Sequence, residues 1–473
     1  MAPSLIELPQ EVLGNILSFL LPSDIVSFGR SCRRAINFIG SSNQLLWRDA
    51  FLHIYDHPED AWATYTQSYE TGRSSWDWHR ELMSRSLAIK ALRQRWPQQA
   101  DKDNYEQHVD TILSIIDTAK SQPSSAELAR GRLPQADDRS SRNLQLLASI
   151  LLEDETGLER LMFDDATSSA RTMSDDFGRP RTRAMTSATK DRNRSDGARR
   201  LHTLYGLSRR DKADRKHFHR RYVYDWQLSN AATDYGPYSR DGSGQINWTL
   251  LEAAMACISL NFGEAVDGQL TPPEGLFYSI PNRTLRSSTI TDDWAGVTGI
   301  WLGTYAFLDY SSLLAFNAGL VDFGITRSFD LRDEPEVCGD LLLMELKLDD
   351  SVRANPVLKT NVPICNDLPP LYFKGSSRGS EYPSIPITTI KGFVALAVGG
   401  REVKWKIIVE YNGVDQWQLE GVQPGGVRSG GIFGVWSNVE HEPNSPVGPF
   451  CYFPQELCKT TSIVLAGGSS MNM

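Results

Sequence analysis

The stretch LPQEVLGNILSFLLPSDIVSFGRSCRRAINFIGSSNQLLWRDAF, residues 8–51, carries the most specific pattern in this chain. Its second residue, Pro9, suits the start of a helix, where the missing N–H of proline costs no hydrogen bond. Pro22-Ser23-Asp24 ends that helix and begins a second one, and a third short helix is expected near Cys32. Between the two prolines the apolar residues recur at helical spacing and form one wide face, made up of Val12, Leu13, Ile16, Leu17 and Leu20.

A unit of three short helices, roughly 45 residues long, is smaller than most chains that fold alone. Part of its apolar surface is therefore expected to be covered by something else. The helical spacing alone leaves two interpretations open. The unit is either a piece of a larger helical domain or a docking module whose apolar face is left for a partner.

The order of residues in this stretch resembles the F-box. The resemblance departs mildly from the family at Arg34-Ala35, where a tryptophan usually follows the Cys-Arg pair. The positions that carry it are Leu8-Pro9 with Glu11, Ile16-Leu17, Phe19-Leu20, Pro22 with Asp24-Ile25, Cys32-Arg33 and Leu46-Trp47-Arg48.

The F-box resemblance implies docking to the Skp adaptor of an SCF ubiquitin ligase, with the cullin and RING subunits bound beyond the adaptor. It further implies a non-catalytic subunit that takes part in protein ubiquitination without a cofactor or an active site of its own. Docking would bury an apolar helical face, with Trp47 as a large anchor. The residues carried over for Skp binding are Leu8, Pro9, Val12, Ile16, Leu17, Leu20, Ile25, Leu46 and Trp47.

Two zones separate this unit (1–50) from the second half. Residues 51–165 are expected to form helices at 75–95, 104–120 and 143–163, because apolar residues recur there at steps of three and four. Residues 166–216 lose this periodicity, which predicts a flexible insertion. Residues 168–221 hold 16 Lys and Arg against six Asp, although the whole chain has a net charge of −9. This basic segment is interpreted as a solvated linker, a nuclear-import or nucleic-acid patch, or a tail controlled by phosphorylation.

Residues 217–473 are expected to be mostly β. A helix capped by Asn247 comes first. The run FVALAVGGREVKWKIIVEY (393–411) alternates apolar residues on both sides of Gly399-Gly400, as a tight hairpin does. Further strands are expected at 299–308, 340–348, 370–375, 416–422 and 431–436. The predicted fold class is α+β, with N-terminal helices followed by a mainly antiparallel β-barrel or sandwich.

The second half also resembles known proteins. Over roughly 220–455 it resembles the C-terminal halves of fungal F-box proteins, and GIWLGTY at 299–305 resembles an element of the β domain of the cyclin D-binding F-box proteins. The resemblance implies a substrate-receptor β-barrel for a protein target that the sequence does not name. The residues predicted to contact the target are Trp301, Tyr305, Trp436 and His441.

Most tryptophans of a β-rich domain are core residues, so each of these aromatic residues has a structural alternative. Trp405, in step with Val403 and Ile407, is expected in the core. Tyr305 and Trp436 lie close to glycines and are expected to line a groove or barrel mouth.

Composition excludes several other classes. The chain is 40% hydrophobic and 23% charged, as in ordinary soluble globular proteins. Its early apolar stretch is too short and too interrupted to span a membrane, and the acidic balance argues against nucleic acid as the main partner. Six scattered cysteines without a Cys-x-x-Cys pair indicate neither a zinc site nor a disulfide framework. A reducing compartment follows, which places the protein in the cytoplasm, the nucleus or both.

Local motifs give no catalytic or metal site. The segment from Ser239 resembles part of a calcium loop but lacks key carboxylates, so a turn is expected. His217 and His219, in KHFHRR, are expected on a solvated basic face, and His441-Glu442 has no identifiable nucleophile beside it. The predicted function is the substrate-recognition subunit of an SCF-type ligase. The alternatives are a β-barrel that binds a small molecule or a peptide terminus, with an F-box acting outside a ligase, and an enzyme in the second half.

Overall fold

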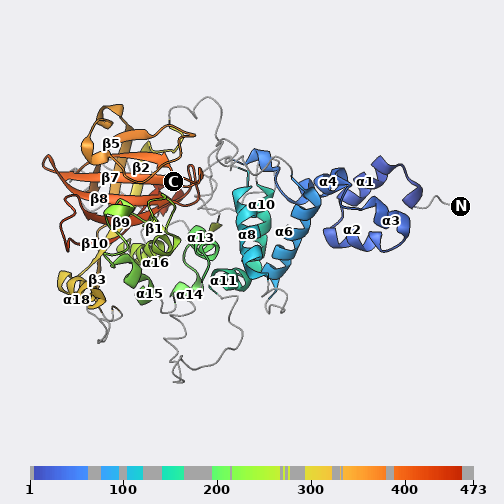
Figure 1. The fold of residues 1–473 in the computed structure, drawn as a ribbon, viewed down its shortest axis with the longest axis horizontal. Helices are drawn as coiled ribbons and strands as arrows, with labels where there is room; N and C mark the ends of the chain where they lie inside the picture. Colours follow the sequence, from blue (N-terminus) through green and yellow to red (C-terminus); the bar gives the residue numbers. More distant parts are fainter. Residues whose placement is uncertain are drawn as a thin grey trace, which may run out of the picture. The chain divides into compact units, whose positions relative to one another are not determined.

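The computed structural model describes residues 5–61, 76–94, 104–120, 141–163, 194–212, 216–266, 270–271, 275–276, 293–321, 331, 334–379 and 388–460. Their helices and strands fall into two compact units, one up to residue 198 and one from residue 199 on. The first unit is helical, and the second is built around a closed antiparallel barrel (Figure 1). The predicted α+β class is therefore confirmed. Among the described helices, none is long and apolar enough to cross a bilayer.

Prolines and capping side chains set the bounds of the first helices. Pro9 is the N-cap of α1, and Pro22 is the first residue of α2. The sulfur of Cys32 accepts a hydrogen bond from the backbone N–H of Ala35 and so caps α3. The segment that contains Leu46-Trp47-Arg48 forms a fourth helix, whereas the sequence predicts three. The elements are η1 (Leu5–Glu7), α1 (Gln10–Ser18), α2 (Pro22–Gly29), α3 (Arg33–Phe38) and α4 (Gln44–Ile54).

The rest of the first unit follows the predicted helices closely. The stretch predicted at 143–163 is two helices, because Asp154 is extended and its carboxylate accepts the N–H of Thr156, which begins the second helix. Buried Asp56 joins distant segments, since its carboxylate accepts the hydroxyl of Ser141 at 2.5 Å and the N–H of Lys120 at 2.9 Å. The elements are η2 (Pro58–Asp60), α6 (Trp78–Arg93), α8 (Tyr105–Asp117), α10 (Arg142–Glu153) and α11 (Thr156–Phe163).

Residues 166–216 were predicted to be irregular, and this is wrong for the described part of the segment. The structure has α13 (Asp196–Tyr205), α14 (Arg209–Lys212) and α15 (Lys216–Val223), and residues 164–193 lie outside the described residues. Several charged side chains of these helices are buried against partners of opposite charge. His202 binds Glu252 at 2.7 Å and Asp211 at 2.9 Å, and His219, 5% exposed, lies 3.8 Å from Asp211. The solvated basic face expected for KHFHRR is therefore wrong at His219.

Eight strands form the barrel, each antiparallel to its neighbours. The last strand pairs with the first, with Phe453 opposite Leu302, and so closes the sheet. The barrel order is β2 (Gly299–Leu308), β4 (Leu342–Leu348), β5 (Leu371–Gly379), β6 (Thr388–Leu396), β7 (Val403–Tyr411), β8 (Val414–Gln423), β9 (Ile432–Asn438) and β10 (Val447–Pro454). All the predicted strands are present, and β10 is an addition.

The barrel interior is filled at one end by aromatic side chains. Trp301 and Trp405 are 2% and 0% exposed, and their rings meet edge to face at 5.1 Å. Phe373 lies 5.7 Å from Trp405. The prediction that Trp405 is a core residue is confirmed, and this end of the barrel holds packed side chains instead of a channel.

Outside the barrel, α16 (Trp248–Ala265) is capped by Asn247 as predicted and packs on one part of the wall. Figure 1 shows it in green beside the strands. Met255 and Phe262 of α16 share a core with Leu302 of β2 and Phe453 of β10. The smaller elements of this unit are η4 (Ala231–Thr233), β1 (Leu270–Thr271), α18 (Tyr310–Val321), β3 (Glu336–Cys338), η5 (Asp350–Val352), η6 (Pro356–Leu358), η7 (Gln455–Leu457) and β11 (Lys459–Thr460).

A second part of the outer wall carries four buried charges, named here the wall cluster: Asp234, Lys404, Lys406 and Glu420. The ammonium of Lys404 lies 2.8 Å from Glu420 and 3.3 Å from Asp234. That of Lys406 lies 3.2 Å from Glu420 and 3.5 Å from Asp234. Each lysine thus bridges both carboxylates. Since Asp234 belongs to the segment before α16, the cluster fixes that segment to β7 and β8.

Candidate functional site

The first candidate site is an apolar surface on α1 and the turn that follows it, named here the α1 face: Val12, Ile16 and Leu20. Their side chains are 46%, 41% and 37% exposed, although all three are aliphatic. On the other side of the same helix Leu13 and Leu17 are buried in the unit. The helix therefore uses one apolar side for its own core and leaves a second one uncovered within this unit.

Of the nine residues predicted for adaptor docking, three form the α1 face. Leu8 is half-buried, and Pro9 is exposed beside the α1 face. The other four are core residues of the unit, namely Leu17, Ile25, Leu46 and Trp47, each 3% exposed or less.

Trp47 does not have the accessibility that a docking anchor needs. Its indole N–H donates to the carbonyls of Ile39 and Gly40 at 3.2 Å, and its ring meets His79 edge to face at 4.7 Å. A satisfied, enclosed indole stabilises its own unit and offers no surface to another protein. We therefore assign Trp47 to the core, and the α1 face remains as the accessible part of the predicted set.

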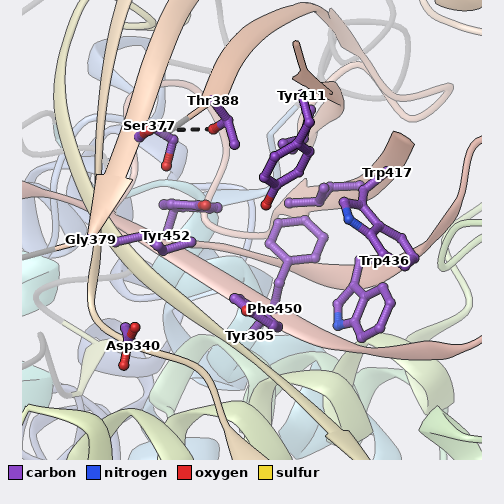
Figure 2. Close-up of a pocket in the computed structure, with 13 residues that line it drawn as sticks. Tyr305, Asp340, Ser377, Gly379, Thr388, Tyr411, Trp417, Trp436, Phe450 and Tyr452 are labelled. Carbon is purple, nitrogen blue, oxygen red and sulfur yellow. Dashed lines mark hydrogen bonds between the residues drawn. The ribbon is translucent and has the colours of Figure 1, made fainter. Parts of the chain in front are cut away.

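The second candidate site is a cavity of about 240 Å³ at one end of the barrel, named here the barrel pocket. Figure 2 shows the side chains that line it. Six of the thirteen are aromatic, and a smaller polar group stands to one side, with the hydroxyl of Thr388 donating to the carbonyl of Ser377 at 3.4 Å. The aromatic members are Tyr305, Tyr411, Trp417, Trp436, Phe450 and Tyr452.

Strand alternation explains why these residues meet. Tyr411 has the same parity in β7 as Trp405, so both point into the barrel, roughly 20 Å apart along the strand. Tyr305 and Trp301 likewise share one parity in β2 and point into the barrel, roughly 13 Å apart along the strand. The two tryptophans plug one end of the interior, and the two tyrosines stand at the pocket end.

The pocket walls are held in place by contacts behind them. The indole N–H of Trp436 donates to the carbonyl of Ala306 at 3.1 Å. The ring of Trp436 meets Trp417 edge to face at 5.2 Å and Tyr305 at 6.1 Å. Burial, together with nearby Tyr411 and Asp340, raises the pKa of the Tyr305 phenol, which therefore stays neutral at physiological pH.

The four residues predicted for target contact lie in three places. Tyr305 and Trp436 line the pocket. Trp301 is in the barrel core, with its N–H donating to the carbonyl of Val297. His441 is not a lining residue and instead stacks on Tyr235 at 3.4 Å. Burial, with a contribution from Lys406, lowers its pKa to about 4.

The sequence reasoning missed Tyr411, Tyr452 and Asp340 as lining residues. For Tyr411 a signal was present, because it continues the alternation of Trp405, Ile407 and Val409. The predicted turn after Ser239 is confirmed, with the carboxylate of Asp241 accepting the N–H of Ser243. Within the described ranges, no group of three or more His, Cys, Asp or Glu is placed to hold a metal ion.

Comparison with known families bears on the first site. An F-box-like family model matches residues 5–53, a range that contains α1, α2 and α3 and most of α4. The N-terminal unit therefore carries an F-box-like domain. A search of curated proteins finds no match for this chain. A search of solved structures finds none either.

Proposed function

We propose that this chain is a substrate-recognition subunit of an SCF-type ubiquitin ligase. The observation that carries the proposal is the exposed α1 face inside the segment matched by the F-box-like model. In this role the Skp adaptor covers the α1 face, and the cullin and RING subunits bind beyond the adaptor. The resemblance of the second half to fungal and cyclin D-binding F-box proteins supports the assignment of target binding to the barrel.

The mechanism in this role is proximity. One unit binds the ligase, the other binds the target, and the target lysines are held at high effective concentration near the ubiquitin carrier. No catalytic group of this chain takes part. The site of action is the cytoplasm, the nucleus or both, where the ligase components are expected to meet it.

The α1 face gives a direct test. Full burial of an aliphatic side chain contributes about 1.5–3 kcal/mol, and since the three side chains are 37–46% exposed, each contributes about 1 kcal/mol on docking. Replacing Val12, Ile16 and Leu20 together by Ala is therefore expected to weaken binding of purified Skp adaptor about a hundredfold. The measurement is isothermal titration calorimetry on the full chain.

Leu152→Ala is the matched control, since Leu152 is 69% exposed on α10 of the same unit and lies outside the matched segment. It is expected to leave adaptor binding unchanged. Equal binding by the triple variant and the original chain, with the same helical content by circular dichroism, would contradict the proposal.

The alternative is a ligand-binding barrel whose F-box-like domain acts outside a ligase. The barrel pocket is the observation that favours it. Reconstituted ubiquitin transfer separates the two functions. Transfer to a bound target in the presence of the Skp adaptor, cullin and RING subunits supports the ligase role, whereas adaptor binding without transfer to any barrel-bound protein supports the alternative.

A further inference from the structure

The barrel pocket has aromatic walls in several orientations. Tyr305 and Tyr411 are each 37% exposed, so their rings stand at the accessible edge of the pocket. The ring of Trp436 is at 86° to that of Tyr305 and at 87° to that of Trp417. Phe450, 0% exposed, lies among them in Figure 2. The π-faces of such rings carry partial negative charge and attract cations.

The charge of the lining agrees with this preference. Among the thirteen described lining residues none is Lys, Arg or His, and Asp340 is the one ionisable carboxylate. Figure 2 shows Asp340 across the pocket from Trp417 and Trp436. A carboxylate or phosphate ligand would therefore meet no positive partner on these residues and would be repelled by Asp340. A cation meets a carboxylate on one side and aromatic rings on the other.

We propose that the barrel pocket binds an N-methylated ammonium cation, supplied by a trimethyllysine side chain of the target protein. The source of the cation, a target protein, rests on the proposed ligase function, whereas the cation preference rests on the pocket alone. The cavity of about 240 Å³ lies below the ~300–1,000 Å³ of pockets for drug-sized ligands, which suits one side chain or a small cation.

The pocket is expected to prefer a methylated ammonium to an unmodified one because the two differ in the hydrogen bonds that they require. An unmodified ammonium has three N–H donors, and each needs an acceptor when it leaves water. Apart from the phenol oxygens of Tyr305, Tyr411 and Tyr452, the described lining offers acceptors on one side only, at Asp340, Ser377 and Thr388. A trimethylammonium group has no donor to satisfy, loses less hydration, and places its methyl groups against the rings.

The test compares peptides that differ only at the end of one side chain. Acetyl-Ala-trimethyllysine-Ala-amide is titrated into the full chain by calorimetry, beside the same peptide with unmodified lysine and with the neutral tert-butyl isostere, in which carbon replaces the nitrogen. We expect the trimethyllysine peptide to bind at least tenfold more tightly than either. Equal binding of the neutral isostere, or no binding of the trimethyllysine peptide, would overturn the proposal.

Free choline distinguishes the two sources of the cation. Choline binding at least tenfold weaker than the peptide supports a target side chain as the ligand. Choline binding as tight as the peptide overturns that source and identifies a free small cation as the ligand of the same site.

Variants of the lining identify the groups responsible. Tyr411→Leu is expected to weaken trimethyllysine binding about tenfold, whereas Tyr411→Phe, which keeps the ring, stays within about twofold. Asp340→Asn is expected to weaken binding severalfold and to reduce its dependence on salt. Because Asp340 is exposed, this variant tests the pocket even where Tyr411→Leu lowers stability. Unchanged binding by both variants would overturn the proposal.

Two controls complete the design. Tyr310→Leu removes an exposed tyrosine of α18 that lies outside the lining, and it should leave peptide binding unchanged. Skp binding by the pocket variants is measured in parallel. In the original chain, Skp binding without discrimination between the peptides contradicts the cation site alone, whereas peptide discrimination without any Skp binding contradicts the ligase role alone.

Discussion

The wall cluster predicts a large and specific loss of stability when one lysine is replaced. Lys404→Met leaves two buried carboxylates, those of Asp234 and Glu420, with Lys406 as their remaining cation. At an effective dielectric constant of ~20, the pairs at 2.8 and 3.3 Å attract by about 6 and 5 kcal/mol. Most of this attraction offsets the cost of removing the charges from water, so the expected loss in the free energy of unfolding is about 3–5 kcal/mol.

A second replacement tests whether the loss comes from unpaired charge. Glu420→Gln added to Lys404→Met restores a balance of one lysine and one aspartate. The double variant should therefore be less destabilised than the sum of the two single variants by about 2 kcal/mol. Burial raises the pKa of the Glu420 carboxyl, and the loss of Lys404 raises it further. Protonation then removes the unpaired charge, so Lys404→Met should cost less at pH 5 than at pH 7.5.

The assay is urea unfolding followed by tryptophan fluorescence, since Trp301 and Trp405 fill the barrel. Lys374→Met is the matched control, because the pair that Lys374 forms with Asp349 at 3.1 Å is exposed and contributes little. A loss below about 1 kcal/mol for Lys404→Met, or full additivity in the double variant, would refute the reasoning.

Two further predictions concern the same unit. Burial alone would lower the pKa of His202, but its carboxylate partners Asp211 and Glu252 outweigh that effect and raise the pKa to about 9. This stabilisation is complete below pH 6.5 and is lost as the pH rises through 9, so the free energy of unfolding should fall by about 3 kcal/mol between pH 6.5 and 9.5. His202→Gln should show a smaller slope, and an unchanged slope would contradict the assignment. A Cβ at Gly434 would lie 2.1 Å from the carbonyl oxygen of Glu420, so Gly434→Ala should lower the melting temperature by several degrees. The control is Gly263→Ala on α16, where an added Cβ would have no neighbouring atom within 4 Å. This variant should raise the melting temperature slightly or leave it unchanged.

The sequence predicts a barrel strand where apolar residues alternate along it, so that one side of the strand is more apolar than the other. The hairpin of β6 and β7 was predicted because its apolar residues alternate around Gly399-Gly400. In β10, VGPFCYFP, all eight residues are buried, since one face points into the barrel and the other meets α16. Burial on both sides removes the alternation, and two prolines further disguise the strand.

The sequence-based predictions fail for charged side chains that form buried pairs within the fold. Arg199 and His202 gave α13 the composition of a solvated segment, yet both bind Glu252 of α16. In the alternation of β7, Lys404 and Lys406 take positions that are as compatible with a solvent-exposed side of the strand as with a covered one. Their partners are 14 or more residues away in the chain, so no local pattern distinguishes a covered lysine from an exposed one. Trp47 shows the same limit for apolar residues, because a core side chain and a docking anchor have the same sequence signature.

The pairing of β2 with β10 has a consequence for synthesis of the protein on the ribosome. The N-terminal helices use contacts between near neighbours in sequence and are complete early in translation. The barrel joins Leu302 to Phe453, so its seam forms only after nearly the whole chain has left the exit tunnel. Premature termination between β2 and β10 would leave the F-box-like domain intact and the sheet unsealed, so the product would keep the proposed adaptor surface while presenting bare strand edges.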